Sequence, residues 1–299
     1  MKKYEFTGET KQINTISGTV TLHRIKASVA FDNIKSGDIG GWIEKKENLS
    51  HDGNAWVYGD AQVYGDARVY GDAWVSGNAR VCGDAQVFGN ARVYGDARVY
   101  DDARVYGDAW VSGNARVCGD AQVYDDAQVF GNAWVFGNAQ VYDDAWVSGD
   151  ARVYGDAWVS GNARVYGDAR VCDDARVYGD AQVFGNARVY GDARVYGDAW
   201  VYGDARVYGD AWVSGNARVY SRKHILLVGP IGSRNDYTIF FRNRNRGISV
   251  SCGCFLGEID KFIEKVIETH GENKHASVYR AAAELAKLQI DLSEMEEEK

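Results

Sequence analysis

The sequence predicts a mainly β protein whose central part is a solenoid, and three observations support this fold class. Residues 53–220 of the 299-residue chain are 28 consecutive units of the form (Gly/Asp)-(Asp/Asn)-Ala-x-Val-y. Ala and Val lie two positions apart, so both point to one side of an extended segment while x and y point to the other. The Gly and the Asp or Asn between segments tolerate the positive φ angles of a tight turn. A short repeat of this kind indicates stacked coils whose core grows by adding units.

Composition and charge exclude several other classes. The chain has no run of 18 apolar residues and no signal-like start before Lys2 and Lys3, so we expect a soluble protein of the cytoplasm that does not bind membranes. The net charge of −8 arises mainly in the repeat, which contains 14 Arg and 23 Asp. An acidic surface favours solubility but identifies no partner.

The hexapeptide unit resembles that of left-handed parallel β-helices. Val-y-Gly-(Asp/Asn)-Ala-x is similar to the repeat of that fold, with an aliphatic residue first and a small residue fifth. The resemblance implies that three units form one triangular coil, so 28 units form about nine coils. At roughly 4.8 Å per stacked strand the solenoid would be about 45 Å long. Left-handed winding is implied by the resemblance alone, because the general crossover rule favours right-handed connections.

The flanking segments extend this resemblance. Residues 21–27 (TLHRIKA), 36–43 (SGDIGGWI) and 47–50 (ENLS) are similar to the lead-in of a family of uncharacterised bacterial and prophage hexapeptide-repeat proteins, often labelled transferases from the repeat alone. Residues 253–257 (GCFLG) and 269–273 (THGEN) resemble a small domain of phage hypothetical proteins. The resemblance therefore implies the fold and a phage or prophage origin, and it brings no established activity.

We expect three parts: an N-terminal β cap at residues 1–52, the hexapeptide β-helix at 53–220, and a small α/β domain at 221–299. The N-terminal block closes the first coil and keeps its edge from pairing with other chains. The C-terminal sequence predicts strands at residues 224–228, 237–241 and 248–252, helices at 258–270 and 276–292, and a frayed tail at 294–299.

Side chains that are three hexapeptide units apart should form columns on the outside of the solenoid. One predicted column combines Gln62 with seven arginines and a tryptophan: Arg80, Arg98, Arg116, Trp134, Arg152, Arg170, Arg188 and Arg206. A second column collects tryptophans: Trp56, Trp74, Trp110, Trp146 and Trp200. Exposed Trp, Tyr and Arg have the composition of interface cores, so we predict that these columns bind a protein partner or a second copy of the chain. Alternatively, the columns only shield and stabilise the β ladder.

The remaining candidate sites are smaller. Arg242, Arg244 and Arg246 alternate onto one side of a predicted hairpin tip, where they could clasp a phosphate or an acidic partner or simply be solvated. The Asp and Asn of the turns form corner rows, but Ala-x-Val leaves no loop to wrap calcium. These rows could imitate nucleic-acid phosphates, although the 14 arginines weaken such a field; direct nucleic-acid binding is not expected.

Cysteine and histidine residues give little support for a metal site. The repeat cysteines share one column two and three coils apart, too far for a disulfide within one chain: Cys82, Cys118 and Cys172. A CxC pair, Cys252 and Cys254, could join His270 at a metal, but a single pair is a weak signal. We expect no metal and no cofactor.

The repeat also lacks the residues expected of an enzyme. Hexapeptide-repeat helices are best known as acyltransferases, which use a histidine base and a protruding loop, whereas residues 53–220 contain no His, Lys or Glu and no inserted loop. A catalytic site needs unlike residues in one unique place. We therefore expect no catalytic residues and predict a non-enzymatic scaffold or interaction protein. An acyltransferase with its site at a subunit junction is the first alternative, and a phage inhibitor that sequesters or mimics a host ligand is the second.

Overall fold

The two central residues of each hexapeptide unit, x and Val, form a short strand. In the computed structural model 28 such strands follow one another, from β4 (Trp56–Val57) to β31 (Arg218–Val219). Ala and y flank each strand, and the Ala carbonyl and the y N–H still form hydrogen bonds between coils. These strands build a parallel β-solenoid of about ten turns, which confirms the predicted fold class. Its expected left-handed sense stays a prediction.

The structure describes residues 2–293, and the chain divides into two compact units, Met1–Asn162 and Ala163–Lys299, which are treated separately below. The tail predicted at residues 294–299 lies outside the described residues. Within residues 2–293, no helix has the length and apolar character needed to cross a membrane.

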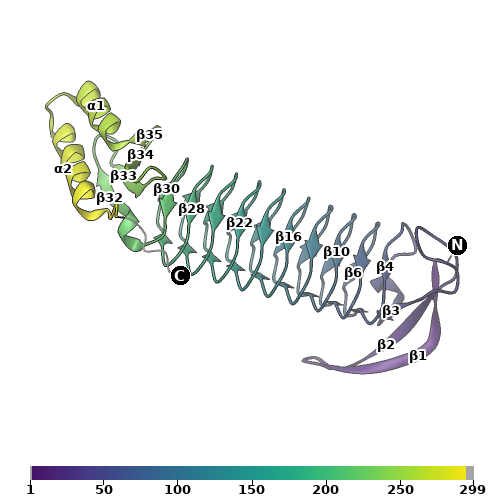
Figure 1. The fold of residues 1–299 in the computed structure, drawn as a ribbon. Coiled ribbons are helices and arrows are strands. Elements are labelled where there is room, and N and C mark those ends of the chain that lie inside the picture. The colour runs from purple at the N-terminus through teal and green to yellow at the C-terminus, as the bar shows by residue number, and fades with distance from the viewer. Residues whose placement is uncertain (1, 294–299) are drawn as a thin grey trace. The chain divides into compact units, whose positions relative to one another are not determined.

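Strands that are three hexapeptide units apart pair in parallel, which confirms the predicted three-unit coil. Trp74 pairs with Arg92, and Arg92 pairs with Trp110. In the first unit the coils therefore stack as three sheets (Figure 1). The arginine face consists of β5 (Gln62–Val63), β8 (Arg80–Val81), β11 (Arg98–Val99), β14 (Arg116–Val117), β17 (Trp134–Val135) and β20 (Arg152–Val153). The tyrosine face consists of β6 (Arg68–Val69), β9 (Gln86–Val87), β12 (Arg104–Val105), β15 (Gln122–Val123), β18 (Gln140–Val141) and β21 (Trp158–Val159). The tryptophan face consists of β4, β7 (Trp74–Val75), β10 (Arg92–Val93), β13 (Trp110–Val111), β16 (Gln128–Val129) and β19 (Trp146–Val147).

The interior of the solenoid is a stack of Ala and Val side chains that are almost completely buried. Each coil is joined to the next by backbone hydrogen bonds at x and y. The N–H of Trp74 donates to the carbonyl of Ala91, and the N–H of Ser76 donates to the carbonyl of Val93, both at 2.9 Å. The x and y side chains are thereby held outward at a fixed spacing of roughly 4.8 Å per coil.

The first residue of each turn must adopt a positive φ close to the backbone of the next coil. Gly83 has a φ of 69°, and a Cβ there would lie 2.8 Å from the backbone nitrogen of Asp101 one coil later. Asp101 occupies the same turn position with a φ of 59°, and its Oδ2 accepts a hydrogen bond from the N–H of Gly119 at 3.3 Å. This hydrogen bond offsets part of the cost of a left-handed conformation in a residue with a side chain.

The first coil precedes the hexapeptide pattern. Trp42 of β3 (Ile39–Ile43) pairs with Gln62, and Leu49 forms a parallel bridge with Val69. Between Trp42 and Leu49 the chain makes the short 3-10 helix η1 (Lys46–Asn48). The N-terminal block therefore supplies a coil of its own as well as the expected cap.

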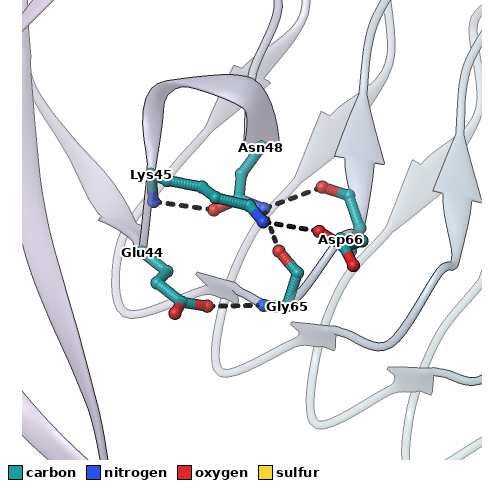
Figure 2. Close-up of polar contacts among 6 residues, drawn as sticks. Glu44, Lys45, Asn48, Gly65 and Asp66 are labelled. Carbon is teal, nitrogen blue, oxygen red and sulfur yellow. Dashed lines mark hydrogen bonds and ion pairs between the residues drawn. The ribbon is translucent and has the colours of Figure 1, made fainter.

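Side-chain donors close the N-terminal end of the solenoid. The amide nitrogen of Asn48 donates to the carbonyls of Gly65 and Ala67 at 3.0 and 2.8 Å (Figure 2). Lys3 Nζ donates to the carbonyls of Gly53 and Ala55 at 3.2 and 2.8 Å, and burial lowers the pKa of Lys3 to about 8. Carbonyls that would be unpaired at the edge of the first coil thus receive hydrogen bonds, and few remain for pairing with another chain.

Two long antiparallel strands, β1 (Tyr4–Thr15) and β2 (Gly18–Ala27), extend the sheet of the arginine face beyond β3. Lys11 Nζ lies 4.2 Å from the Trp42 ring centroid, and the guanidinium carbon of Arg24 lies 4.8 Å from it. The arginine face therefore begins with a tryptophan that two cations cover.

The solenoid continues in the second unit with ten strands that stack in the same three-unit order. They are β22 (Arg164–Val165), β23 (Arg170–Val171), β24 (Arg176–Val177), β25 (Gln182–Val183), β26 (Arg188–Val189), β27 (Arg194–Val195), β28 (Trp200–Val201), β29 (Arg206–Val207), β30 (Trp212–Val213) and β31.

A small domain follows the last coil. Its antiparallel sheet contains β32 (Ile225–Ile231), β33 (Asp236–Arg242), β34 (Ile248–Cys252) and β35 (Phe255–Glu258), and it packs against α1 (Ile259–His270) and α2 (Lys274–Gln289) around a core that includes Phe240, Phe262 and Tyr279. This confirms the predicted strands and helices; β35 was not predicted. The N–H of Arg244 donates to the carbonyl of Asn216 at 2.9 Å, so the β33–β34 hairpin covers the end of the last coil.

Candidate functional site

The arginine face presents the column of cations that the sequence predicted. In the first unit Arg80, Arg98 and Arg116 occupy three successive coils, and neighbouring arginines pair directly in the parallel sheet. Arg80 and Arg98 are exposed and Arg116 is half-buried. None of the three makes an ion pair with a carboxylate among residues 2–293. The sheet therefore holds like charges one coil apart, an arrangement that is unfavourable in isolation.

Trp134 interrupts this column. The guanidinium carbons of Arg116 and Arg152, from the preceding and following coils, lie 4.6 and 5.5 Å from the centroid of its ring. The edge of Trp134 also meets the Phe136 ring at 6.2 Å. The structure thus brings together three of the predicted partner-binding residues in one cation–aromatic cluster.

The neighbouring column on the arginine face alternates tyrosine with cysteine over its first four hexapeptide coils. Burial, together with a hydrogen bond to Cys82, raises the pKa of Tyr64 to about 12. Burial likewise raises the pKa of the Cys82 and Cys118 thiols. None of the three repeat cysteines forms a disulfide with another described residue. Thiols in this state are weak nucleophiles, so the column offers shape and hydrogen bonding more than reactivity.

In the second unit Arg170, Arg188 and Arg206 pair with one another in three successive coils. Arg206 lines a pocket of about 280 Å³ together with Tyr190, Tyr208 and Leu227. This pocket mixes an aromatic wall with a cation, which resembles the composition of the Trp134 cluster.

The tryptophan face differs from its prediction at the first residue. Trp56 was expected to be an outward partner-binding residue, but it is completely buried, and this prediction is wrong. Phe31 and Tyr4 contact its ring edge-on at centroid distances of 5.4 and 6.4 Å. A Cβ on Gly40 would lie 2.6 Å from the Trp56 ring, so the glycine makes room for this packing. Trp74 is half-buried, and Trp110 and Trp146 are exposed as expected.

The outward side chains of the tyrosine face contact one another from coil to coil. The rings of Tyr70, Phe88, Tyr106, Tyr124 and Tyr142 stack one above another at 4.8 to 5.0 Å. The hydroxyl groups of Tyr70, Tyr106 and Tyr124 donate to the side-chain carbonyl of a glutamine in the following coil at 3.1 to 3.2 Å. These three hydroxyl groups therefore have partners within the chain, which fits the alternative that the outward columns stabilise the β ladder.

At the C-terminal hairpin, the predicted arginine clasp does not form as expected. Arg242 is buried, with its guanidinium carbon 4.8 Å from the Tyr220 ring centroid and its Nη2 donating to the Ser293 carbonyl at 3.1 Å. The prediction that Arg242 faces a ligand is therefore wrong, because the side chain packs on the last coil of the solenoid. Arg244 and Arg246 are exposed at the tip.

Two polar features were not identified from the sequence. Asp32 and Asn33, in the loop after β2, border an open groove on the tryptophan face that also contains Trp74 and Arg92. Trp42, with Lys11 and Arg24 over its ring, begins the arginine face. Neither follows from the hexapeptide pattern, although the SGDIGGWI segment marks Trp42 as part of the first coil.

Comparisons with known proteins agree with the repeat architecture. The family described as YdcK beta solenoid repeat matches residues 61–77, 85–101, 97–113, 127–143, 139–155, 145–161, 157–173, 169–183, 181–197, 187–203 and 199–215. All of these segments lie within the hexapeptide region, so the chain is similar to that family in its repeats. No curated protein matches the chain.

A solved structure also resembles the chain. It is the UDP-N-acetylglucosamine acyltransferase of Francisella novicida, which is 11% identical with a TM-score of 0.43 over 56% of this chain and 65% of that chain. The chain thus spans less than two thirds of that protein, and at this TM-score the likeness carries no argument about activity. The phage origin and the transferase label stay predictions.

Proposed function

We propose that this protein is a non-enzymatic β-solenoid that binds through its outward columns, and that the arginine face mediates association with a second copy of the chain. The observation that carries the proposal is the run of Arg80, Arg98 and Arg116 without a carboxylate partner among residues 2–293. Two unit charges about 4 Å apart repel by about 1 kcal/mol even in water. A surface that supplies carboxylates at the same spacing relieves this repulsion.

The chain itself carries such a surface. The corner that follows the arginine face has Asp84, Asp102 and Asp120 at the second turn position of the same successive coils, and all three are exposed. The arginine column and the aspartate column both repeat once per coil. The arginines of one copy can therefore lie opposite the aspartates of a second, parallel copy at the same spacing. The Trp134 cluster lies beside the arginine run and adds the aromatic and arginine residues in which interface hot spots are enriched.

Acyl transfer is the alternative raised by the sequence, and the histidines nearest the solenoid do not favour it. His51 Nδ1 accepts a hydrogen bond from the Lys3 backbone N–H at 3.2 Å, and its ring stacks on Tyr4. His23 stacks on Phe6, and His224 packs against Tyr220. Each of these imidazoles takes part in the packing of an end of the solenoid.

Sedimentation velocity on paired variants tests the proposal. Arg98→Glu with Arg116→Glu should abolish self-association of the protein at low salt. Asp102→Lys with Asp120→Lys should do the same, and an equimolar mixture of the two double variants should associate again because the charges are exchanged. Arg68→Gln with Arg104→Gln on the tyrosine face is the matched control and should leave association unchanged.

Two outcomes would contradict the proposal. A wild-type protein that sediments as a monomer at every concentration and salt would rule out the second copy as the partner. Association that survives the Arg98→Glu/Arg116→Glu change would rule out the arginine face. Unchanged thermal unfolding of each variant shows that a loss of association does not reflect misfolding.

A further inference from the structure

The outward side chains of the tryptophan face in the first unit alternate between two arrangements from coil to coil. A tryptophan at x occurs together with a serine at y in every second coil: Trp74 with Ser76, Trp110 with Ser112, and Trp146 with Ser148. The coils between them carry Arg92 with Tyr94 and Gln128 with Phe130. The small serine leaves space beside each indole, and neither of the other two faces of the first unit repeats a tryptophan in every second coil.

Each exposed indole is held by the coil before it. The Tyr94 ring meets Trp110 edge-on at a centroid distance of 6.3 Å, and the guanidinium carbon of Arg92 lies 5.2 Å from the Trp110 ring. Phe130 meets Trp146 edge-on at 6.0 Å. Trp110 and Trp146 nevertheless remain 39% and 38% exposed. They are therefore ordered aromatic platforms in contact with solvent, which reduces the ordering cost of binding.

A polar wall runs beside these platforms along the preceding corner. The N–H of Asn54 donates to Asp72 Oδ1, and Asn90 Nδ2 donates to Asp108 Oδ1, both at 3.0 Å. The second carboxylate oxygen of Asp72 and of Asp108 makes no hydrogen bond to any other described residue. These oxygens are fixed acceptors next to the aromatic column, and with Trp74 they line an open groove of about 630 Å³.

The indole, carboxylate and carboxamide groups that line this groove suit a neutral sugar. An indole face takes the C–H face of a pyranose ring, while carboxylate and carboxamide groups accept and donate hydrogen bonds to its hydroxyls. The carboxylates of the wall disfavour polyanions, including nucleic acids. An extended peptide has no strand edge to join here, because the backbone N–H groups at x and y already donate to the Ala and Val carbonyls of the next coil.

The spacing of the platforms identifies the form of the polymer. Tryptophans two coils apart are separated by roughly 10 Å, twice the distance between paired strands. An extended β-1,4-linked glycan turns over at each ring, so it presents the same ring face at every second sugar, a comparable distance. We propose that the tryptophan face of the first unit binds a neutral, β-1,4-linked polysaccharide, with Trp74, Trp110 and Trp146 each stacking on alternate sugar rings.

Calorimetric titration with cellohexaose and chitohexaose tests this site. At least one of the two should bind, the corresponding disaccharide should bind more weakly because it reaches only one platform, and curved, α-linked maltohexaose should not bind. Trp110→Ala should weaken the affinity about tenfold, as expected when a central aromatic contact is lost. Trp158→Ala is the matched control, because Trp158 occupies the same GDAWVS hexapeptide on the tyrosine face.

Three results would overturn the proposal. Neither hexasaccharide binds at millimolar concentration, or Trp158→Ala weakens binding as much as Trp110→Ala does, or an oligothymidylate binds with the same dependence on Trp110 while the hexasaccharides do not. The site is independent of the self-association proposed above, because Trp110→Ala should leave the sedimentation of the protein unchanged. Unaltered thermal unfolding of both variants excludes misfolding as the cause of a loss.

Discussion

The guanidinium carbon of Arg116 lies 4.6 Å from the centroid of the Trp134 ring in the next coil of the arginine face. Arg152 approaches the same ring from the following coil at 5.5 Å. Exposed contacts of this kind are worth about 0.5–1 kcal/mol each. Trp134 thus separates Arg116 from Arg152 and provides each with a favourable neighbour where a further arginine would repel both.

Replacing this tryptophan by arginine should destabilise the first unit. Trp134→Arg removes two cation–aromatic contacts and adds two like-charge contacts, so we expect a loss of at least about 1 kcal/mol at low salt. High salt screens exposed charges and should restore part of this loss. Thermal unfolding of Trp134→Arg and of the uncharged control Trp134→Gln at low and high salt measures both effects. Equal unfolding temperatures of the two variants at low salt would contradict the repulsion argument.

Deletion of a whole coil should be tolerated. Removing residues 89–106, which make up three hexapeptide units, joins identical turn positions and keeps every later side chain in its column. Removing only residues 89–100, which make up two units, moves each later column to a different face. We expect the first variant to remain soluble with the wild-type far-ultraviolet circular dichroism spectrum and the second to lose thermal stability. The opposite order would show that three units do not form the coil.

Variants of Asp101 should separate the effect of its hydrogen bond to Gly119 from the effect of backbone strain at this turn. Asp101→Ala loses the hydrogen bond to Gly119 N–H and keeps a side chain at a φ of 59°, so we expect a loss of about 1–2 kcal/mol. Asp101→Gly loses the same hydrogen bond but removes the backbone strain, so its stability should lie within about 0.5 kcal/mol of wild type. Urea unfolding measures both variants. An alanine variant as stable as the glycine variant would contradict this account.

The C-terminal end should weaken in acid. Tyr220 N–H donates to His224 Nδ1 at 3.4 Å, and burial followed by the charge of Arg242 lowers the pKa of His224 from 6.5 to about 4. The folded state therefore binds fewer protons than the unfolded state between these values. The contribution of neutral His224 to the free energy of unfolding is therefore fully present above pH 6.5 and is lost as the pH falls toward 4.

A variant with a neutral acceptor isolates this effect. His224→Gln keeps a side chain that can accept the Tyr220 hydrogen bond but does not titrate. Its thermal unfolding should depend less on pH between 6.5 and 4 than that of the wild type. Parallel pH profiles of the two proteins would show that His224 does not carry the dependence.

The protein should not bind acyl-coenzyme A. The described solenoid offers no imidazole outside the packed ends, where His51 stacks on Tyr4 and His224 packs on Tyr220. Calorimetric titration with acetyl-coenzyme A should give no heat of binding beyond dilution. Micromolar binding that is lost in His23→Ala, His51→Ala or His224→Ala would instead support the acyltransferase alternative.

The sequence predicted the parts of the structure that depend on local pattern. Ala and Val at alternate positions, with a left-handed residue at each turn, determine the coil, and the three-unit spacing then places Arg116 beside Trp134. Strand length was less predictable, because only x and Val form each strand although the Ala carbonyl and the y N–H also form hydrogen bonds between coils. The C-terminal strands and helices followed from their hydrophobic periodicity, except for the short β35.

Packing between distant segments could not be predicted in this way. Trp56 occupies the same x position of the hexapeptide as the exposed tryptophans, but Phe31 and Tyr4, from the block that precedes the repeat, pack against its ring. Arg242 alternates with Arg244 in sequence, but the Tyr220 ring lies within its reach. The groove beside Asp32 depends likewise on where the loop after β2 packs. One hexapeptide does not contain this information.

The alternation of tryptophan–serine coils with bulkier coils constrains how the gene for this protein can grow. Residues 71–82 and 107–118 have the same sequence, GDAWVSGNARVC, and lie two coils apart. A duplication of two coils adds one indole and preserves the rhythm of the tryptophan face. A duplication of one coil preserves the core and the identity of every face, but it places two like coils next to each other and shifts the phase of all later tryptophans. The solenoid core can therefore lengthen in single coils, whereas the pattern of the tryptophan face is kept only when coils are added in pairs.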